Sequence, residues 1–266
     1  MLASSLRAFY SRPMWRDVKQ LYADSAAFAL ALPVLFSIPV LLEFAQHVVE
    51  IDLGLYRHGL AAAAAFDQRR LILGFAKVLS LLLPGYWFTR YMAWNRDANR
   101  AKRIERPAAT LFGIQFAFKA GWQWFALFGP PLGVMLGLAP RASSYAGLVA
   151  MIAASVVSIY LTAWFVAWPL GNARIGPFRS VAIMAGSFAR AFFYVAAGTL
   201  PLMIVHYALG YGAIGRPEWL VWIMMAVDAL VVGFLALTGA GALFLGARYA
   251  AGRKNIAMDG AALNAG

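Results

Sequence analysis

Six long apolar stretches most constrain what this 266-residue chain can fold into. We place them approximately at residues 26–49, 71–94, 122–138, 145–168, 191–211 and 219–245. A helix of about 20 apolar residues is long enough to cross the hydrocarbon core of a bilayer. Only 13% of the residues are charged, whereas soluble domains have about 25%. The sequence therefore predicts an all-α, polytopic membrane protein with six transmembrane helices.

Lysines and arginines gather in the gaps between alternate pairs of these stretches. Sixteen of the 23 lie in the N-terminal segment, the second and fourth gaps and the C-terminal tail, and five lie in the other gaps. Basic residues are retained on the cytoplasmic side of a membrane. We therefore expect a protein of the bacterial inner membrane with both termini cytoplasmic. Its parts would be a basic amphipathic segment (1–25), a membrane domain (26–247) and a cytoplasmic tail (248–266), with a short amphipathic helix within the first outer loop, 50–70.

The net charge of +12 has several possible partners. In a membrane protein, anionic lipid headgroups at the cytoplasmic face are the expected ones. The aromatic-basic ladder of proteins that bind single-stranded nucleic acid does not occur outside the apolar stretches, so nucleic acid is not an expected partner. The chain has no cysteine, which excludes disulfides, iron–sulfur clusters and thiol catalysis. Phosphate-binding glycine loops and zinc-protease motifs are also absent, so no cofactor is expected.

Proline positions indicate a threefold repeat. Pro13, Pro107 and Pro177 each precede an odd-numbered stretch, which in turn contains Pro33, Pro131 or Pro201. Proline suits the first turn of a helix. We therefore expect interfacial elbow helices at 13–23, 107–118 and 177–188, each followed by a proline-kinked span and a returning span. The basic residues expected to contact lipid headgroups at these elbows are Lys19, Arg106, Lys119, Arg179 and Arg190.

The segment 167–180, Ala-Trp-Pro-Leu-Gly-Asn-Ala-Arg-Ile-Gly-Pro-Phe-Arg-Ser, and the following 186–190, Gly-Ser-Phe-Ala-Arg, carry a family resemblance. They resemble the elbow region of bacterial six-span proteins of the YciC type and of the membrane domain attached to some glycerophosphodiester phosphodiesterases. The resemblance covers about residues 90–245. It implies an architecture of elbow helices and six spans, and no particular activity. Those families carry an acidic residue in this loop, and this chain has none between Glu105 and Glu218.

Two ionisable residues lie deep inside predicted spans, where a charge costs about 2.5–3.5 kcal/mol on insertion scales. Lys77 lies in the second stretch and Asp228 in the sixth. Their expected depths match and their charges are opposite, so we predict that they pair. The pair could be a clamp between helices or an ion-coupled transport site.

Three further polar residues lie near the outer ends of their stretches: Glu43 and His47, one helical turn apart, and His206. Together they could form a polar cavity that opens to the outside. A divalent metal ion is an alternative occupant. His58 is the only other histidine and no two histidines are closely spaced, so the sequence does not predict a metal site.

The sixth stretch carries small residues at helical spacing, including Gly233, Ala236, Gly239 and Ala240. Such a face permits close contact between helices, within the chain or between subunits of a homo- or hetero-oligomer.

No catalytic constellation stands out, so we expect no enzymatic activity. The main expectation is an integral membrane protein that handles lipids or amphiphiles, or a scaffold subunit of a membrane complex. The alternative is a secondary transporter that uses Lys77 and Asp228. A lipid-modifying enzyme is a third class, with Asp97 and Glu105 as the available acidic groups at the cytoplasmic interface.

Overall fold

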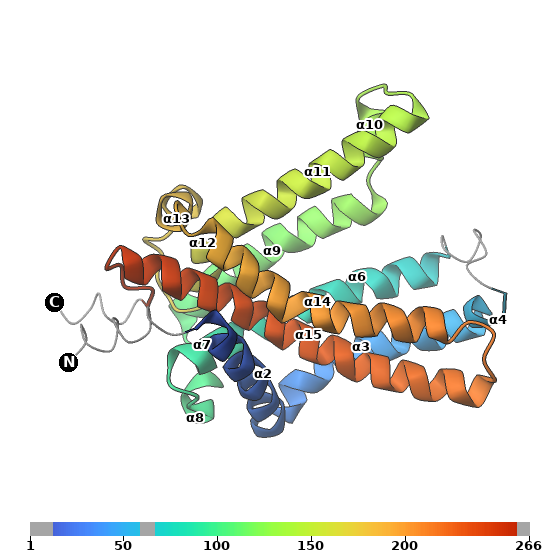
Figure 1. Cartoon of the computed structure of the whole chain (residues 1–266), viewed down its shortest axis with the longest axis horizontal. Helices are drawn as coiled ribbons and strands as arrows, with labels where there is room; N and C mark the ends of the chain where they lie inside the picture. The colour runs from blue at the N-terminus through green and yellow to red at the C-terminus, as the bar shows by residue number, and fades with distance from the viewer. Residues whose placement is uncertain (1–12, 59–66, 260–266) are drawn as a thin grey trace. The chain divides into compact units, whose positions relative to one another are not determined.

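The computed structural model describes residues 13–58 and 67–259, and every regular element in these ranges is a helix (Figure 1). The all-α polytopic architecture is therefore confirmed. The helices are α2 (Met14–Ala31), α3 (Pro33–Asp52), α4 (Leu55–His58), α6 (Gln68–Leu82), α7 (Gly85–Ala93), α8 (Ala98–Ala101), α9 (Arg106–Phe128), α10 (Leu132–Met135), α11 (Pro140–Tyr160), α12 (Thr162–Ala167), α13 (Pro177–Met184), α14 (Phe188–Gly212) and α15 (Glu218–Arg253). The middle of the loop 50–70 and both chain ends lie outside the described residues.

Five segments among the described residues are long and apolar enough to cross a membrane. They are Pro33–Asp52, Gln68–Ala93, Pro140–Tyr160, Phe188–Gly212 and Glu218–Arg253. The segment Gln68–Ala93 comprises α6 and α7, which are separated by a short turn at Leu83 and Pro84. Helix α9 is not among the five, so the sixth span stays a prediction. Helix α15 continues through the first six residues of the predicted tail, 248–253.

The prolines act mainly as helix starts. Leu32 leaves the helical conformation, with φ −133° and ψ 61°, and Pro33 then begins α3. The first elbow is therefore a helix of its own, α2, which extends to Ala31. The third elbow is the separate helix α13, which ends at Met184 before α14 begins at Phe188.

The second elbow differs from the prediction. The structure has one continuous helix from Arg106 to Phe128 where the sequence predicted an elbow at 107–118 and a span at 122–138. Pro107 lies in the first turn of α9, as expected. The helix ends at Gly129, because the two prolines that follow, Pro130 and Pro131, have no amide hydrogen and cannot continue it. The predicted kink at Pro131 is therefore a helix end.

The chain forms two compact units. Unit 1 comprises Met1–Arg103 with Phe193–Ala242, and unit 2 comprises Ile104–Phe192 with Leu243–Gly266. In unit 1, α3 packs against α6 along most of its length and also contacts α15 (Figure 1). In unit 2, α9 and α11 form a hairpin with α10 at its tip (Figure 1).

Small residues of α15 pack against other helices of unit 1. A side chain added at Gly233 would lie 2.9 Å from the Phe36 ring and closer still to Val40, both on α3. A side chain at Gly198 of α14 would lie 2.9 Å from Ala242. The small-residue face predicted to permit close helix contact is thus packed, at Gly233, against a helix of the same chain, and contact between subunits stays a prediction.

The acidic face of α2 points into unit 1. Asp24 forms an ion pair with Arg96, whose Nη2 donates to Oδ2 at 3.0 Å, and the Tyr194 hydroxyl donates to Asp17 at 2.6 Å. The hydrogen bond to Asp24 raises the pKa of Arg96 above its ordinary value. Trp15 and Lys19 lie on the opposite, exposed face. This division agrees with an amphipathic helix.

Candidate functional site

One face of α3 carries four buried polar side chains. Glu43, Gln46, His47 and Glu50 are spaced at i, i+3, i+4 and i+7, so they lie along one stripe of the helix. Each is at most 7% exposed, and Glu43 is completely buried. A buried polar stripe in an apolar helix requires partners on the neighbouring helices, because an unpaired charge is costly away from water.

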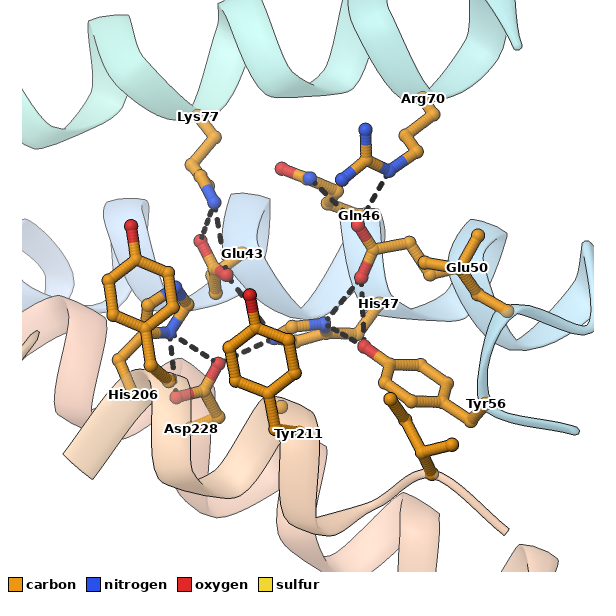
Figure 2. Close-up of a pocket in the computed structure, with 14 residues that line it drawn as sticks. Glu43, Gln46, His47, Glu50, Tyr56, Arg70, Lys77, His206, Tyr211 and Asp228 are labelled. Atoms are coloured by element: carbon orange, nitrogen blue, oxygen red, sulfur yellow. Dashed lines mark hydrogen bonds and ion pairs between the residues drawn. The ribbon is translucent and has the colours of Figure 1, made fainter. Parts of the chain in front are cut away.

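Helix α6 supplies two of these partners. The Lys77 Nζ lies 2.9 Å and 3.2 Å from the two Glu43 carboxylate oxygens, and the Arg70 Nε donates to Glu50 at 2.9 Å. Figure 2 shows both basic side chains extending from α6 toward α3. Glu43 and Glu50 are two helical turns apart, as are Lys77 and Arg70. The packing is therefore antiparallel and aligns two ion pairs in one register.

His47 lies between carboxylates. Its Nδ1 is 3.0 Å from Glu50 Oε2, and its Nε2 is 2.9 Å from Asp228 Oδ2 and 3.2 Å from Glu43 Oε1. The imidazole can donate to carboxylates on both sides only in its protonated form. His47 thus links α3 to α15 through Asp228 (Figure 2).

Tyr56 of α4 holds the other end of this network. Its hydroxyl donates to Glu50 Oε2 at 2.9 Å and lies 3.1 Å from His47 Nδ1. Burial and the neighbouring Glu50 carboxylate raise the pKa of Tyr56 well above its ordinary value. The phenol therefore keeps its proton and stays a donor at neutral pH.

Asp228 is fully buried and joins two histidines. His206 Nδ1 lies 2.8 Å from both oxygens of Asp228, and His47 contacts Oδ2 from the other side. His206 comes from α14, and its side chain is 20% exposed. Three helices therefore meet at one carboxylate.

These residues line a cavity of about 170 Å³ in unit 1 (Figure 2). The walls also include Tyr207, Gly210 and Tyr211 near the end of α14, Ile214 just after it, and Leu55. Gln46 Oε1 is buried and has no hydrogen-bond partner among the described residues. The cavity therefore offers both charged groups and a free buried acceptor to a small ligand.

All five residues that the sequence singled out as a polar site line this cavity: Glu43, His47, Lys77, His206 and Asp228. The predicted ion pair between Lys77 and Asp228 is wrong. Lys77 pairs with Glu43, and Asp228 is held by the two histidines. Matched depth placed Lys77 and Asp228 in one layer, but depth does not specify which side of a helix faces which neighbour.

The sequence interpretation missed Gln46, Glu50, Tyr56 and Arg70. Glu50 and Arg70 lie at the two ends of the predicted outer loop, 50–70, and the structure places them on α3 and α6. The spacing of Glu50, seven residues after Glu43, was the signal that it continues the same helix face.

A metal ion is one possible occupant of the site. Glu43, His206 and Asp228 each offer one ligand atom, and these atoms all lie within 4.8 Å of one another. The three residues come from three different helices, so their proximity could not be inferred from spacing along the chain.

The residues predicted to contact lipid headgroups are spread over both units. Lys19, Arg106 and Arg179 are exposed. Lys119 lies in the middle of α9 with its ammonium 4.0 Å from the Phe165 ring centre, and the Arg190 guanidinium lies 4.1 Å from the ring centre of Tyr249. Lys119 therefore does not occupy a separate elbow helix, and headgroup contact stays a prediction for all five.

Comparisons of this chain with protein-family models, curated proteins and solved structures find no match. The resemblance to YciC-type proteins and to the phosphodiesterase-linked membrane domain therefore stays a prediction about architecture.

Proposed function

We propose that this chain is a secondary transporter whose solute-binding site is the ionic cavity of unit 1. The observation that carries the proposal is a cavity lined by buried Glu43, His47 and Asp228 together with Lys77 and His206. It lies among α3, α6, α14 and α15, and all four belong to segments long and apolar enough to cross a membrane. Ionisable groups inside such segments mark ion or substrate pathways.

The depth of the cavity supports this assignment. Lys77 lies nine residues from the start of α6, Glu43 nine residues from the end of α3 and Asp228 ten residues from the start of α15. At 1.5 Å per residue, each lies about 14–15 Å from the helix end. The charged groups thus share one level within the apolar segments.

A purely structural role accounts less well for this network. A buried ion pair can often be replaced by apolar residues with no loss of stability. Here the carboxylates of Glu43, Glu50 and Asp228 are matched by Lys77, Arg70 and His47. Balanced charge around an open cavity suits a site that must remain stable when it is empty.

Interrupted helices also favour transport. Leu83 and Pro84 interrupt the segment that contains α6 and α7, and Leu32 separates α2 from α3. Discontinuous membrane helices are typical of transporters, where they permit local movement and expose backbone groups.

For localisation and orientation we propose the bacterial inner membrane, with both termini cytoplasmic and the cavity nearer the outer face. The basic residues of the predicted cytoplasmic segments support this orientation. Anionic headgroups at that face are the proposed lipid partners.

Flux measurements on the full chain in proteoliposomes test the proposal. A panel of mono- and divalent cations, organic anions and amino acids should contain at least one solute that crosses faster than in empty liposomes. The Asp228→Asn variant should lose this flux, whereas Asp52→Asn, which changes an exposed carboxylate and serves as the matched acidic control, should keep it. Equal flux in protein-containing and empty liposomes for the whole panel contradicts transport of these solute classes.

A second candidate function, lipid handling, is favoured by a groove in unit 1. Trp15, Val18, Lys19 and Tyr22 of α2 line it with Ala197 and Pro201 of α14, and its volume is about 380 Å³. The groove combines an apolar floor with one cation, as an anionic phospholipid requires. Co-purified anionic lipid that decreases in Lys19→Gln, but not in Arg216→Gln, an exposed arginine outside the predicted headgroup contacts, is the expected result under this function.

A further inference from the structure

Four side chains with metal-ligating atoms converge in the cavity from three helices. Glu43, His206 and Asp228 place their ligand atoms within 4.8 Å of one another. The Nε2 of His47 lies beside them, 2.9 Å from Asp228 Oδ2 and 3.2 Å from Glu43 Oε1. Two imidazoles and two carboxylates therefore surround one point (Figure 2).

The distances between these atoms are close to those around a bound ion. Zinc is bound by histidine nitrogen and carboxylate oxygen at about 2.0–2.2 Å, so ligand atoms at tetrahedral corners are about 3.4 Å apart. The corresponding separations here are 2.8 Å between His206 and Asp228 and 2.9–3.2 Å between His47 and the two carboxylates. An outward shift of about half an ångström would make room for an ion.

The surroundings of His47 match those of a metal-binding histidine. Its Nε2 faces the convergence point, and its Nδ1 is held by the Glu50 carboxylate and the Tyr56 hydroxyl. Histidine ligands of metals usually donate their second ring nitrogen to a carboxylate, which fixes the ring and increases its basicity. Glu50 and Tyr56 therefore orient His47 in the way that residues around a metal site orient its histidine ligand.

Gln46 is an unsatisfied polar group in another part of the cavity wall, on the side of α6. Its side chain lines the same cavity, the residue is 7% exposed, and its Oε1 accepts no hydrogen bond among the described residues. Buried acceptors in proteins are nearly always satisfied. A small ligand or water molecule in this part of the cavity would supply the missing donor.

We infer that the cavity binds a divalent first-row transition cation of the zinc, cobalt or manganese type, with Glu43, His47, His206 and Asp228 as its ligands. Two nitrogen and two oxygen donors favour this class over magnesium and calcium, which prefer oxygen alone. The inference deepens the proposed function, since the cation would be the transported solute or its coupling ion. Lys77 is then a competitor, because its ammonium contacts the Glu43 carboxylate that the cation needs.

Titration of the purified full chain in detergent with Zn²⁺ and Co²⁺ tests the inference. Calorimetry should report one equivalent of Zn²⁺, and Co²⁺ should give the visible absorption of a four-coordinate site. His206→Gln and Asp228→Asn should each weaken binding by at least about 100-fold, because loss of an outer-shell group alone costs about 10–100-fold. Asp52→Asn should bind like the unchanged chain.

Lys77→Met is the decisive variant, because misfolding cannot imitate its effect. Removal of the competing ammonium should tighten Co²⁺ binding by about tenfold or more, the effect of about 1.4 kcal/mol. Absence of binding at millimolar Co²⁺, or binding that His206→Gln and Lys77→Met both leave unchanged, would overturn the inference.

The Co²⁺ titration and the flux measurement together separate this inference from the proposed function. If another solute crosses the membrane but Co²⁺ does not bind, the metal site is contradicted and the transporter function is supported. If Co²⁺ binds specifically but no solute crosses the membrane, the metal site is supported and the transporter function is contradicted.

Discussion

At the scale of single residues, Glu43 is the acidic partner that Lys77 requires. The Lys77→Met change leaves a fully buried carboxylate without its cation, and we expect it to destabilise the protein by up to about 3–5 kcal/mol. Adding Glu43→Gln should recover part of the loss, with a coupling energy of about 0.5–3 kcal/mol. Thermal unfolding of the purified variants in detergent measures both quantities.

The matched comparison for this prediction is Lys77→Met combined with Asp228→Asn. Asp228 has histidine partners and forms no ion pair with Lys77 among the described residues. The two losses should therefore add with little recovery. A larger coupling between Lys77 and Asp228 than between Lys77 and Glu43 would contradict the pairing described here.

The sequence predicted which residues line the site better than it predicted which of them contact each other. Charges deep in apolar stretches identified Lys77 and Asp228, because placing such groups there is costly. The partner of each depends on how its helix is rotated, and hydropathy along the chain carries no information on the rotation of one helix against another. The sequence does carry one signal for Glu43 as the partner of Lys77, because the polar face of α3 extends from Glu43 to Glu50.

At the scale of helices, Gly233 controls the approach of α15 to α3. Gly233→Ala introduces a Cβ against Phe36 and Val40, and we expect a loss of about 1–3 kcal/mol in stability from overpacking. Gly113→Ala in α9 is the control, since nothing lies within 4 Å of its added Cβ. Replacing that helical glycine should stabilise by about 0.5–1 kcal/mol, so opposite shifts in unfolding temperature are expected.

The start of α6 depends on Asp67. Its side chain accepts hydrogen bonds from the backbone amides of Arg69, at 2.9 Å, and Arg70, at 3.4 Å. Desolvation acts in the opposite direction, but the hydrogen bonds from Arg69 and from both amides lower the pKa of Asp67. A lowered pKa in the folded state means that this contribution is present above the pKa of the unfolded chain and is lost as the pH falls through the folded value.

Hydrogen exchange of the first α6 amides should therefore increase as the pH falls below the ordinary range of aspartate, after correction for the intrinsic exchange rate. The Asp67→Ala variant should show the faster exchange already at neutral pH. A first turn equally protected in both proteins would mean that the cap is not needed.

Proline spacing predicted where helices begin more reliably than where they end. Pro107 and Pro177 each lie in a first turn and Pro13 comes directly before α2, as expected from their missing amide hydrogen. Pro33 was expected as a kink within the first span, and it begins α3 instead. Separation of an elbow from its span depends on the residues between them. Gly186, with φ +78°, interrupts the helical conformation before α14. Helix α9 has no comparable interruption between Pro107 and Phe128.

At the scale of the whole molecule, the orientation in the membrane is directly testable because the chain has no cysteine of its own. Single cysteines at Arg100 and Arg57 should react with a membrane-impermeant thiol reagent on opposite sides in intact cells. We expect Arg57→Cys to be labelled from outside and Arg100→Cys only after permeabilisation. Labelling of Arg100→Cys from outside would reverse the predicted topology.

The paired register of α3 and α6 determines how these helices can move. Glu43 with Lys77 and Glu50 with Arg70 are separated by two turns on both helices. A slide by one turn, about 5.4 Å, would move both carboxylates away from their cations at the same moment, so neither pair could compensate for the other. Both ion pairs therefore form in the same register of α3 against α6. Sliding between α3 and α6 is therefore all-or-none, while tilting about the pairs leaves both of them engaged.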